Sequence, residues 1–225
     1  MKLNVINLGT MDYKEAFDLQ FKLLEKRKNE EIEDTFLLLE HPPVITLGRN
    51  AKKENILFSE KYLKEHDVDL LEINRGGDVT YHGPGQLVGY PIVNIKKQKL
   101  GVKDFVYKLE QIFIDLLKEE YGIDAARDDI NNGVWVNNEK ITALGLAVKR
   151  WITMHGFALN VCTDLDFFKL IVPCGIEGRG VTSLEKLTDR KIDMKDISKK
   201  VEKYFTREFN YTEVVETTIE ELEVD

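Results

Sequence analysis

Residues 75–90, with the sequence RGGDVTYHGPGQLVGY, contain the residue types that a binding site needs. Two glycine clusters, Gly76-Gly77 and Gly83-Pro84-Gly85, flank a short β-branched and aromatic run that predicts a strand. Glycine permits tight bends and close approach of a ligand, because it has no Cβ. Such bends place backbone N–H groups, Arg75 and His82 at one edge of a sheet. Glycine and proline clusters also mark ordinary turns, but the number of polar side chains at fixed offsets favours a binding site.

Two other kinds of site are disfavoured by their missing motifs. A phosphate-binding loop would show G-x-x-x-x-G-K-[ST], or a G-x-G-x-x-G that opens a helix, and neither pattern is present. A metal site would need three or four His, Cys, Asp or Glu ligands at short spacing. Because neither H-E-x-x-H nor C-x-x-C occurs, the sequence predicts no metal and no cofactor.

The two cysteines have different surroundings. Cys162 ends an apolar run, so it is interpreted as a small buried hydrophobic residue. Cys174 stands between Pro173 and Gly175, where a thiol can be exposed on rigid backbone and neighbouring N–H groups can meet an oxyanion. Since a single cysteine in a loop is weak support for a nucleophile, Cys174 is a candidate that needs a partner.

A nucleophilic cysteine needs a neighbouring base or cation, because a free thiol has a pKa of about 8.5 and is mostly protonated at neutral pH. His82, His155 and Lys140 are the candidates. Lys140 opens the run 141–145, whose alternating tiny and apolar residues can hold the lysine stem in apolar surroundings. A partly desolvated lysine has a lowered pKa and can act as a base. The alternative is a solvent-exposed lysine after the turn at 137–138.

The elements that position these residues follow one another without a regular βαβ rhythm. Strands are predicted at 2–8, 35–39, 44–47, 69–73, 87–95, 125–127, 133–136, 141–151 and 153–161. Helices are predicted after Asp12, from Ser59 to His66, around 105–116 and from Asp193 to Phe209. Hairpin-like connections between many of the strands favour an α+β fold over a doubly wound one. Pro91, inside a predicted strand, is expected at a sheet edge or a bulge.

Length and composition bound the class of protein. The 225 residues, 43% hydrophobic and 32% charged, predict one globular domain with a real core. The net charge of −8 argues against nucleic acid as the main partner, because no basic field is available to neutralise phosphates. No apolar run is long enough to span a bilayer, and the first residues lack a signal-peptide core. With only two cysteines and no disulfide scaffold, the sequence predicts a cytoplasmic protein without a membrane partner.

Together the motifs resemble those of the octanoyltransferases of lipoate biosynthesis. The resemblance lies in HPPVITLGR at 41–49, RGGDVTYHGPGQ at 75–86, KITALG at 140–145, HGFALN at 155–160 and PCG at 173–175, in the family's order. It implies the catalytic fold of the biotin and lipoate protein ligases, an α+β fold of mixed sheets packed with helices. It also implies a single domain over residues 1–225, with the catalytic core at about 31–210.

The resemblance implies an enzyme that moves an octanoyl group from acyl carrier protein to a lysine of a lipoyl domain. The acceptors would be 2-oxo acid dehydrogenase E2 subunits and glycine cleavage H protein. The acyl-thioester nucleophile falls on Cys174 and the thiol-activating lysine on Lys140, with His155 as a supporting candidate. Substrate-binding positions fall on Arg75, Gly76, Gly77, Asp78, Val79, Thr80, Tyr81, His82, Ala143, Leu144, Gly145, Gly156, Phe157 and Ala158. Exchange of a thioester for another thioester and then an amide runs downhill, so this chemistry requires no nucleotide.

Three other hypotheses remain open. An ATP-dependent lipoate or biotin protein ligase would share the fold, form an acyl-adenylate and need no cysteine. An octanoyl amidotransferase would move the chain from one lipoyl domain to another. A non-catalytic module would dock a carrier or a lipoyl domain without reaction. The HGPGQ motif at 82–86 together with PCG at 173–175 favours the transferase over the ligase, and Lys140 and Cys174 favour it over the docking module.

Overall fold

The computed structural model describes residues 1–128, 131–172 and 179–224. The strands are β1 (Lys2–Thr10), β2 (Asp34–Glu40), β3 (Val44–Leu47), β4 (Asp69–Glu72), β5 (Val79–His82), β6 (Gln86–Ile92), β7 (Ala126–Arg127), β8 (Gly133–Val136), β9 (Glu139–Lys149), β10 (Ile152–Asn160), β11 (Gly180–Val181) and β12 (Glu213–Glu216). The helices are α1 (Tyr13–Lys28), α2 (Glu60–Glu65), α3 (Val102–Tyr121), α4 (Leu184–Thr188) and α5 (Met194–Glu208), with 3-10 turns η1 (Lys53–Asn55) and η2 (Leu165–Leu170). The predicted α+β architecture is confirmed.

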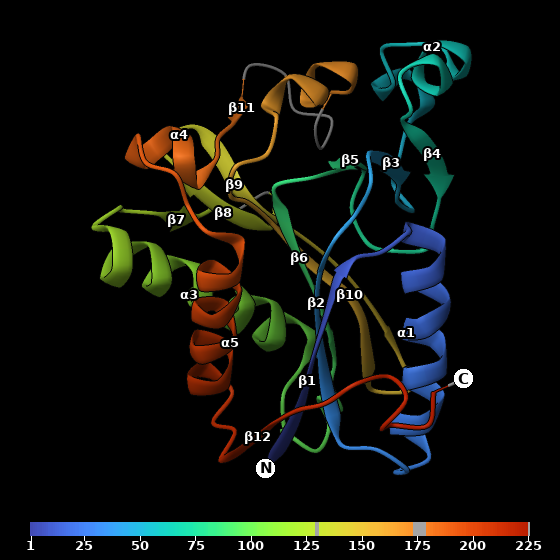
Figure 1. Cartoon of the computed structure of the whole chain (residues 1–225), viewed down its shortest axis with the longest axis vertical. Coiled ribbons are helices and arrows are strands. Elements are labelled where there is room, and N and C mark those ends of the chain that lie inside the picture. Colours follow the sequence, from blue (N-terminus) through green and yellow to red (C-terminus); the bar gives the residue numbers. More distant parts are fainter. Residues whose placement is uncertain (129–130, 173–178, 225) are drawn as a thin grey trace.

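The larger of two mixed sheets runs through the middle of the molecule (Figure 1). Its strand order in the described residues is β12-β1-β2-β6-β10-β9-β8-β7, and β11 pairs with β9 outside this path. β1 pairs in parallel with both β2 and β12, so strands from opposite ends of the chain are neighbours. β2, β6, β10, β9 and β8 continue as antiparallel pairs. The acidic β12 was not predicted.

The central strand β2 explains why helices lie on both faces of this sheet. Phe36 and Leu38 belong to the core that includes α3 and α5, whereas Leu37 and Leu39 belong to the core that includes α1. Successive side chains of a strand point to opposite faces, so a continuous apolar strand needs cover on both. Figure 1 shows α3 and α5 on one face of the sheet and α1 on the other.

The smaller sheet, in the order β4-β3-β5, stands with α2 beside one end of the larger sheet (Figure 1). The bends that bound β5 contain Gly77 at φ +89° and Gly85 at φ +79°, conformations that favour glycine. The two predicted bends around a short strand are therefore confirmed. β5 belongs to the small sheet and β6 to the large one, so the motif at 75–86 carries the chain from one sheet to the other.

Local signals at the helix ends agree with the structure, and one strand signal does not. Asp12, Ser59 and Asp193 cap α1, α2 and α5 through their side chains, and Gly122 at φ +69° ends α3. Pro91 is not at a sheet edge, because β6 lies between β2 and β10. The ladder between β6 and β10 extends only from Gln86 to Gly89, so no β10 residue pairs with Pro91. Neither ladder of β6 has the register shift of a bulge, so the interruption is found in place of the expected edge or bulge.

A buried ion pair ties the start of β2 to distant parts of the chain. Asp34, 4% exposed, accepts hydrogen bonds from Arg27 Nε at 2.7 Å, Tyr211 OH at 2.8 Å and Asn94 N at 2.9 Å. Arg27 itself is 3% exposed. Removing one member of such a pair leaves the other charge buried without compensation.

We therefore expect Asp34→Ala to lower the free energy of unfolding by about 3–5 kcal/mol, measured by urea denaturation. The matched control is Glu213→Ala. Its carboxylate lies 3.5 Å from Lys2 Nζ at an exposed position, and such surface pairs contribute about 1 kcal/mol or less. A loss in Asp34→Ala no larger than that of the control would contradict the prediction.

Candidate active site

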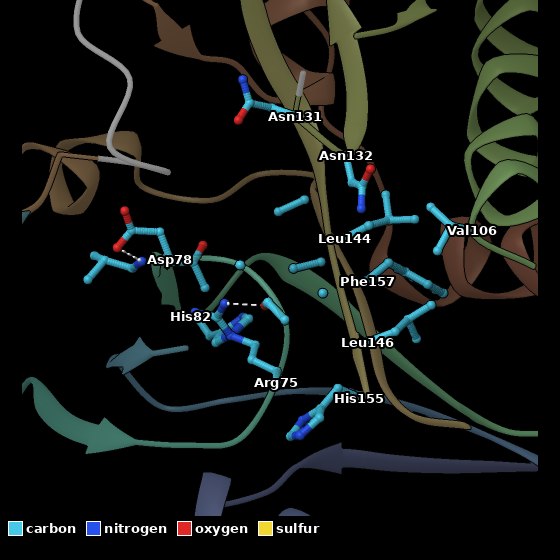
Figure 2. Close-up of a pocket in the computed structure, with 18 of the residues that line it drawn as sticks. Arg75, Asp78, His82, Val106, Asn131, Asn132, Leu144, Leu146, His155 and Phe157 are labelled. Atoms are coloured by element: carbon cyan, nitrogen blue, oxygen red, sulfur yellow. Dashed lines mark hydrogen bonds between the residues drawn. The ribbon is translucent and has the colours of Figure 1, made fainter. Parts of the chain in front are cut away.

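A cavity of about 440 Å³ opens where the glycine-rich loop meets β9 and β10. It is lined by Lys140, His155 and thirteen of the predicted substrate-binding residues: Arg75, Gly76, Gly77, Asp78, Val79, Thr80, His82, Ala143, Leu144, Gly145, Gly156, Phe157 and Ala158. In Figure 2, Arg75, Asp78 and His82 lie on one side of the cavity, and Leu144, Leu146, Phe157 and Val106 lie on the other. The site thus has a polar wall and an apolar wall.

The floor of the cavity consists of small residues. Gly145 pairs with Gly156 across the two strands, and Ala143 pairs with Ala158. A Cβ added at Gly145 would lie 3.0 Å from Gly76 O, and one at Gly156 would lie 2.0 Å from Gly89 O. Backbone therefore approaches backbone at both positions, which requires glycine at 156 and leaves very little room for a side chain at 145.

The loop that forms the polar wall is fixed on both sides. Gly76 N donates to Leu146 O of β9 at 3.1 Å. The guanidinium of Arg75 donates to Thr46 O at 2.8 Å and to Thr46 Oγ1 at 2.9 Å, which ties the loop to β3. Arg75 is 7% exposed and still lines the cavity. One side chain thus anchors the loop and places a positive charge at the site.

Tyr81 is the one predicted substrate-binding residue that is not part of the cavity lining. Its ring stacks on Phe167 with a centroid separation of 4.9 Å and an interplanar angle of 3°. It belongs to the core of the small sheet, together with Ile45 and Leu63. Tyr81 therefore supports the loop from behind rather than facing the cavity.

The histidines around the cavity are buried, and burial holds them in the neutral form. It lowers the pKa of His41 to about 4 and that of His155 to about 3. Burial, together with the neighbouring His41 imidazole and Arg75 guanidinium, keeps the pKa of His82 well below its ordinary value. His82 Nδ1–H donates to Gln86 Oε1 at 2.8 Å, which orients the ring. Among the described lining residues, the basic side chains other than histidine are those of Arg75 and Lys140.

Lys140 is buried, with 7% of its surface exposed, which excludes the solvent-exposed alternative. Its Nζ donates to Asn132 O at 3.1 Å and lies 4.7 Å from the centroid of the Trp135 ring. Its stem packs on Gly133, where an added Cβ would lie 3.2 Å from Lys140 Cε. The amine is thus held at the cavity by a carbonyl and an aromatic face.

Cys174 lies outside the described residues, as do Pro173 and Gly175. The chain that follows is placed beside Lys140, because Val181 pairs in parallel with it and Thr182 N donates to Lys140 O at 3.0 Å.

Cys162 is exposed rather than buried, so its predicted role as a buried hydrophobic residue is wrong. It lies two residues beyond Asn160, the last residue of β10, where the apolar run ends at the surface. Partial burial and the charges of Glu185 and Glu40 raise the pKa of its thiol. These surroundings disfavour a thiolate at Cys162.

Several lining residues carry no sequence signal of a binding site, among them Tyr13, Asn50, Tyr90, Val102, Val106, Asn131 and Asn132. Val102 and Val106 have the four-residue spacing of a helix face, which predicts core packing as readily as a site. Within the described part of the chain, no three or more His, Cys, Asp or Glu side chains gather to hold a metal ion. In the same residues, no helix is long and apolar enough to cross a membrane.

The chain matches the family described as the lipoyl protein ligase A/B catalytic domain over residues 12–206. It belongs to this family. It is 56% identical over 217 residues to the octanoyltransferase of Alkaliphilus metalliredigens, covering 96% of this chain and 99% of that one. The octanoyltransferase of Caldicellulosiruptor saccharolyticus is 55% identical, over 93% of this chain and 89% of that one. The resemblance to octanoyltransferases is confirmed, and the protein is an enzyme of the acyltransferase class.

Solved structures establish the fold of this family member. Lipoate-protein ligase A bound with ATP superposes with a TM-score of 0.79 at 16% identity, covering 99% of this chain and 91% of that one. A biotin protein ligase from Aquifex aeolicus, in complex with biotin and ATP, superposes with a TM-score of 0.57 at 17% identity, covering 92% and 70%. The predicted biotin/lipoate ligase fold is confirmed, and at these identities the likeness concerns the fold alone.

The neutral histidines predict how stability depends on pH. The folded pKa of His155 is about 3, below its unfolded value of about 6.5, so the unfolded state binds the proton first. The stability that the neutral His155 contributes is therefore fully present above pH 6.5 and is lost as the pH falls toward the folded pKa. One such histidine contributes a slope of about 1.4 kcal/mol per pH unit.

We expect His155→Asn to reduce the slope of the unfolding free energy against pH between about 5 and 6.5. The reduction should correspond to about one fewer proton taken up on unfolding. The measurement is urea denaturation across that range. Asn74→Ala is the control, because it removes the Oδ1 atom that lies 3.4 Å from His155 Nε2 and leaves the imidazole in place. Equal slopes for His155→Asn and the unmodified protein would contradict the assignment.

Proposed function

We propose that this enzyme transfers an octanoyl group from acyl carrier protein to a lysine of a lipoyl domain through a thioester on Cys174. The observation that carries the proposal is a buried lysine amine beside a cavity with one apolar wall, in a chain 56% identical to an octanoyltransferase. The acceptors are lipoyl domains of 2-oxo acid dehydrogenase E2 subunits and glycine cleavage H protein. A reducing cytoplasm would keep the Cys174 thiol available.

The shape of the cavity supports an acyl substrate. Its volume of about 440 Å³ lies within the range of roughly 300–1,000 Å³ that is usual for small-molecule sites. Leu144, Leu146 and Phe157 supply an apolar wall, and the glycines of the floor leave room for a chain. The polar loop on the other side offers backbone groups and the Arg75 guanidinium.

The first step forms the acyl-enzyme. The Cys174 thiolate attacks the carbonyl carbon of the octanoyl thioester, a new C–S bond forms, and the bond to the carrier sulfur breaks. The carrier leaves as a thiol after taking up a proton. Donors aimed at the tetrahedral oxyanion are worth about 10²–10³ in rate for each donor.

The second step forms the amide. The neutral amine of the acceptor lysine attacks the thioester carbonyl, a C–N bond forms, and the Cys174 sulfur leaves as a thiolate. Lys140 mediates the proton transfers of both steps, and such general acid–base help contributes about 10²–10⁴. Bonds and protons balance without an oxidant, a reductant or a nucleotide.

Contacts of the described residues support placing Cys174 near Lys140. The Cζ atom of Arg179 lies 3.7 Å from the centroid of the Trp135 ring, the same ring that Lys140 Nζ approaches. The Arg179 guanidinium also pairs with the Asp128 carboxylate at an N–O distance of 2.6 Å. Gly180 then pairs with Glu139, at the start of the strand that carries Lys140. The segment that follows Cys174 is thereby joined to the lysine strand.

Intact-mass measurement of the enzyme mixed with octanoyl-carrier tests the proposal. We expect one octanoyl adduct that disappears when apo-lipoyl domain is added. Cys174→Ser should abolish the thioester adduct, and Lys140→Ala should slow its formation by about 10²-fold or more. Cys162→Ser is the matched control, since the only other cysteine is exposed and should be dispensable. An unchanged adduct in Cys174→Ser would refute the assignment.

The same assay separates the remaining hypotheses. The ATP-dependent ligase hypothesis has a specific basis, because the ATP-bound ligase shares this fold. Octanoyl transfer from the carrier without ATP and Mg²⁺ is expected here, whereas a ligase would require both. An amidotransferase would instead prefer octanoylated H protein as the donor. Binding of the carrier without any transfer would identify a docking module.

A further inference from the structure

Glu110 is a buried carboxylate directly behind the Lys140 site. It lies on α3 one helical turn after Val106, which lines the cavity, and only 5% of its surface is exposed. Buried carboxylates are rare unless they are paired or hydrogen-bonded. Glu110 Oε2 lies 3.3 Å from Arg127 Nε, and Glu110 Oε1 accepts a hydrogen bond from Gly133 N at 2.9 Å.

The second of these contacts leads to Lys140 through a single peptide group. The N–H of Gly133 and the C=O of Asn132 belong to the same planar unit, and in a trans peptide they point in opposite directions. Glu110 binds the N–H, and Lys140 Nζ donates to the C=O at 3.1 Å. One peptide therefore lies between a carboxylate and an ammonium, with its dipole aligned to both. Hydrogen bonds in such a chain polarise and strengthen one another.

Gly133 can hold this peptide only because it is glycine. Its φ is +135°, and an added Cβ would lie 2.6 Å from Thr142 O and 3.2 Å from Lys140 Cε. The lysine stem occupies the space that a side chain would take. The position of the peptide and the position of the lysine are consequently fixed together.

We propose that Glu110 is a positioning residue that holds the Lys140 amine at the cavity through the Asn132–Gly133 peptide. The inference rests on the role of Lys140 in the proposed function and adds the group that fixes its geometry. Burial raises the pKa of Glu110, whereas the Gly133 N–H and the charges of Arg127 and Lys140 act in the opposite direction. The competing explanation is that Glu110 only pairs with Arg127 and supports the fold.

A double-mutant cycle on the full-length enzyme distinguishes the two explanations. The rate of octanoyl transfer from octanoyl-carrier to apo-lipoyl domain is measured for Glu110→Ala, Lys140→Ala and the double variant. We expect Glu110→Ala to lower kcat about 10-fold, because small misplacements of a reacting group are costly, with little change in KM. In the Lys140→Ala background, Glu110→Ala should have no further effect, because the two residues act as one unit.

Three further variants serve as controls. Glu110→Gln should recover part of the rate, since the amide oxygen can still accept from Gly133 N–H, and it remains informative if Glu110→Ala does not fold. Glu119→Ala, on the exposed side of the same helix and paired with Arg207, should leave kcat unchanged. Arg127→Gln should lower stability more than kcat. Circular dichroism and thermal melting report the folding of every variant.

The outcomes separate this inference from the proposed function. Additive losses in the double variant, or an Arg127→Gln enzyme that reproduces the loss in kcat, would overturn the positioning role and leave the acyl transfer intact. If Lys140→Ala transfers the octanoyl group at the rate of the unmodified enzyme, the role assigned to the lysine is overturned, and the inference with it. A loss that vanishes in the Lys140→Ala background supports the peptide-mediated contact.

Discussion

The structure depends on backbone that approaches backbone, without side chains between, where the two sheets meet. The loop around Gly76 reaches β9 closely enough to donate a hydrogen bond to Leu146 O. At Gly145, a single added carbon would already lie 3.0 Å from Gly76 O. The opposite side of the loop is fixed by Arg75 on Thr46. The width of the cavity and the position of the small sheet are therefore set by the same few contacts.

These contacts also determine the electrostatics of the site. Burial keeps His82 and His155 neutral, so these two rings add no positive charge to that of Arg75 and Lys140. Arg75 and Lys140 are each 7% exposed, and charges interact more strongly where water is scarce. The Asp78 carboxylate also lines the cavity, but the two basic side chains outnumber it, so the cavity favours an anion within it. A thiolate and the oxyanion of a tetrahedral intermediate are both such anions, which links the packing to the proposed chemistry.

The glycine motif was predictable because its signals are local. The bends around β5 and the cap at Asp12 follow from residue type and spacing, and the structure has them where they were expected. Tyr81 and Pro91 were misplaced because their surroundings depend on distant residues. Tyr81 turns toward Phe167, which lies far along the chain. Pro91 sits on a central strand whose ladder with β10 stops at Gly89.

Glu110 shows a further limit, since an acidic residue on an amphipathic helix is ordinarily interpreted as solvent-exposed. The placement of Glu110 also bears on how the Lys140 amine can be held in one position and still keep its positive charge at the cavity. A carboxylate in direct contact with Lys140 would cancel the positive charge at the cavity. A peptide between them keeps the carboxylate on the far side of Gly133 while the Asn132 carbonyl orients the amine. In the proposed mechanism, the Lys140 ammonium therefore stays aimed at the cavity, with its charge available to a thiolate.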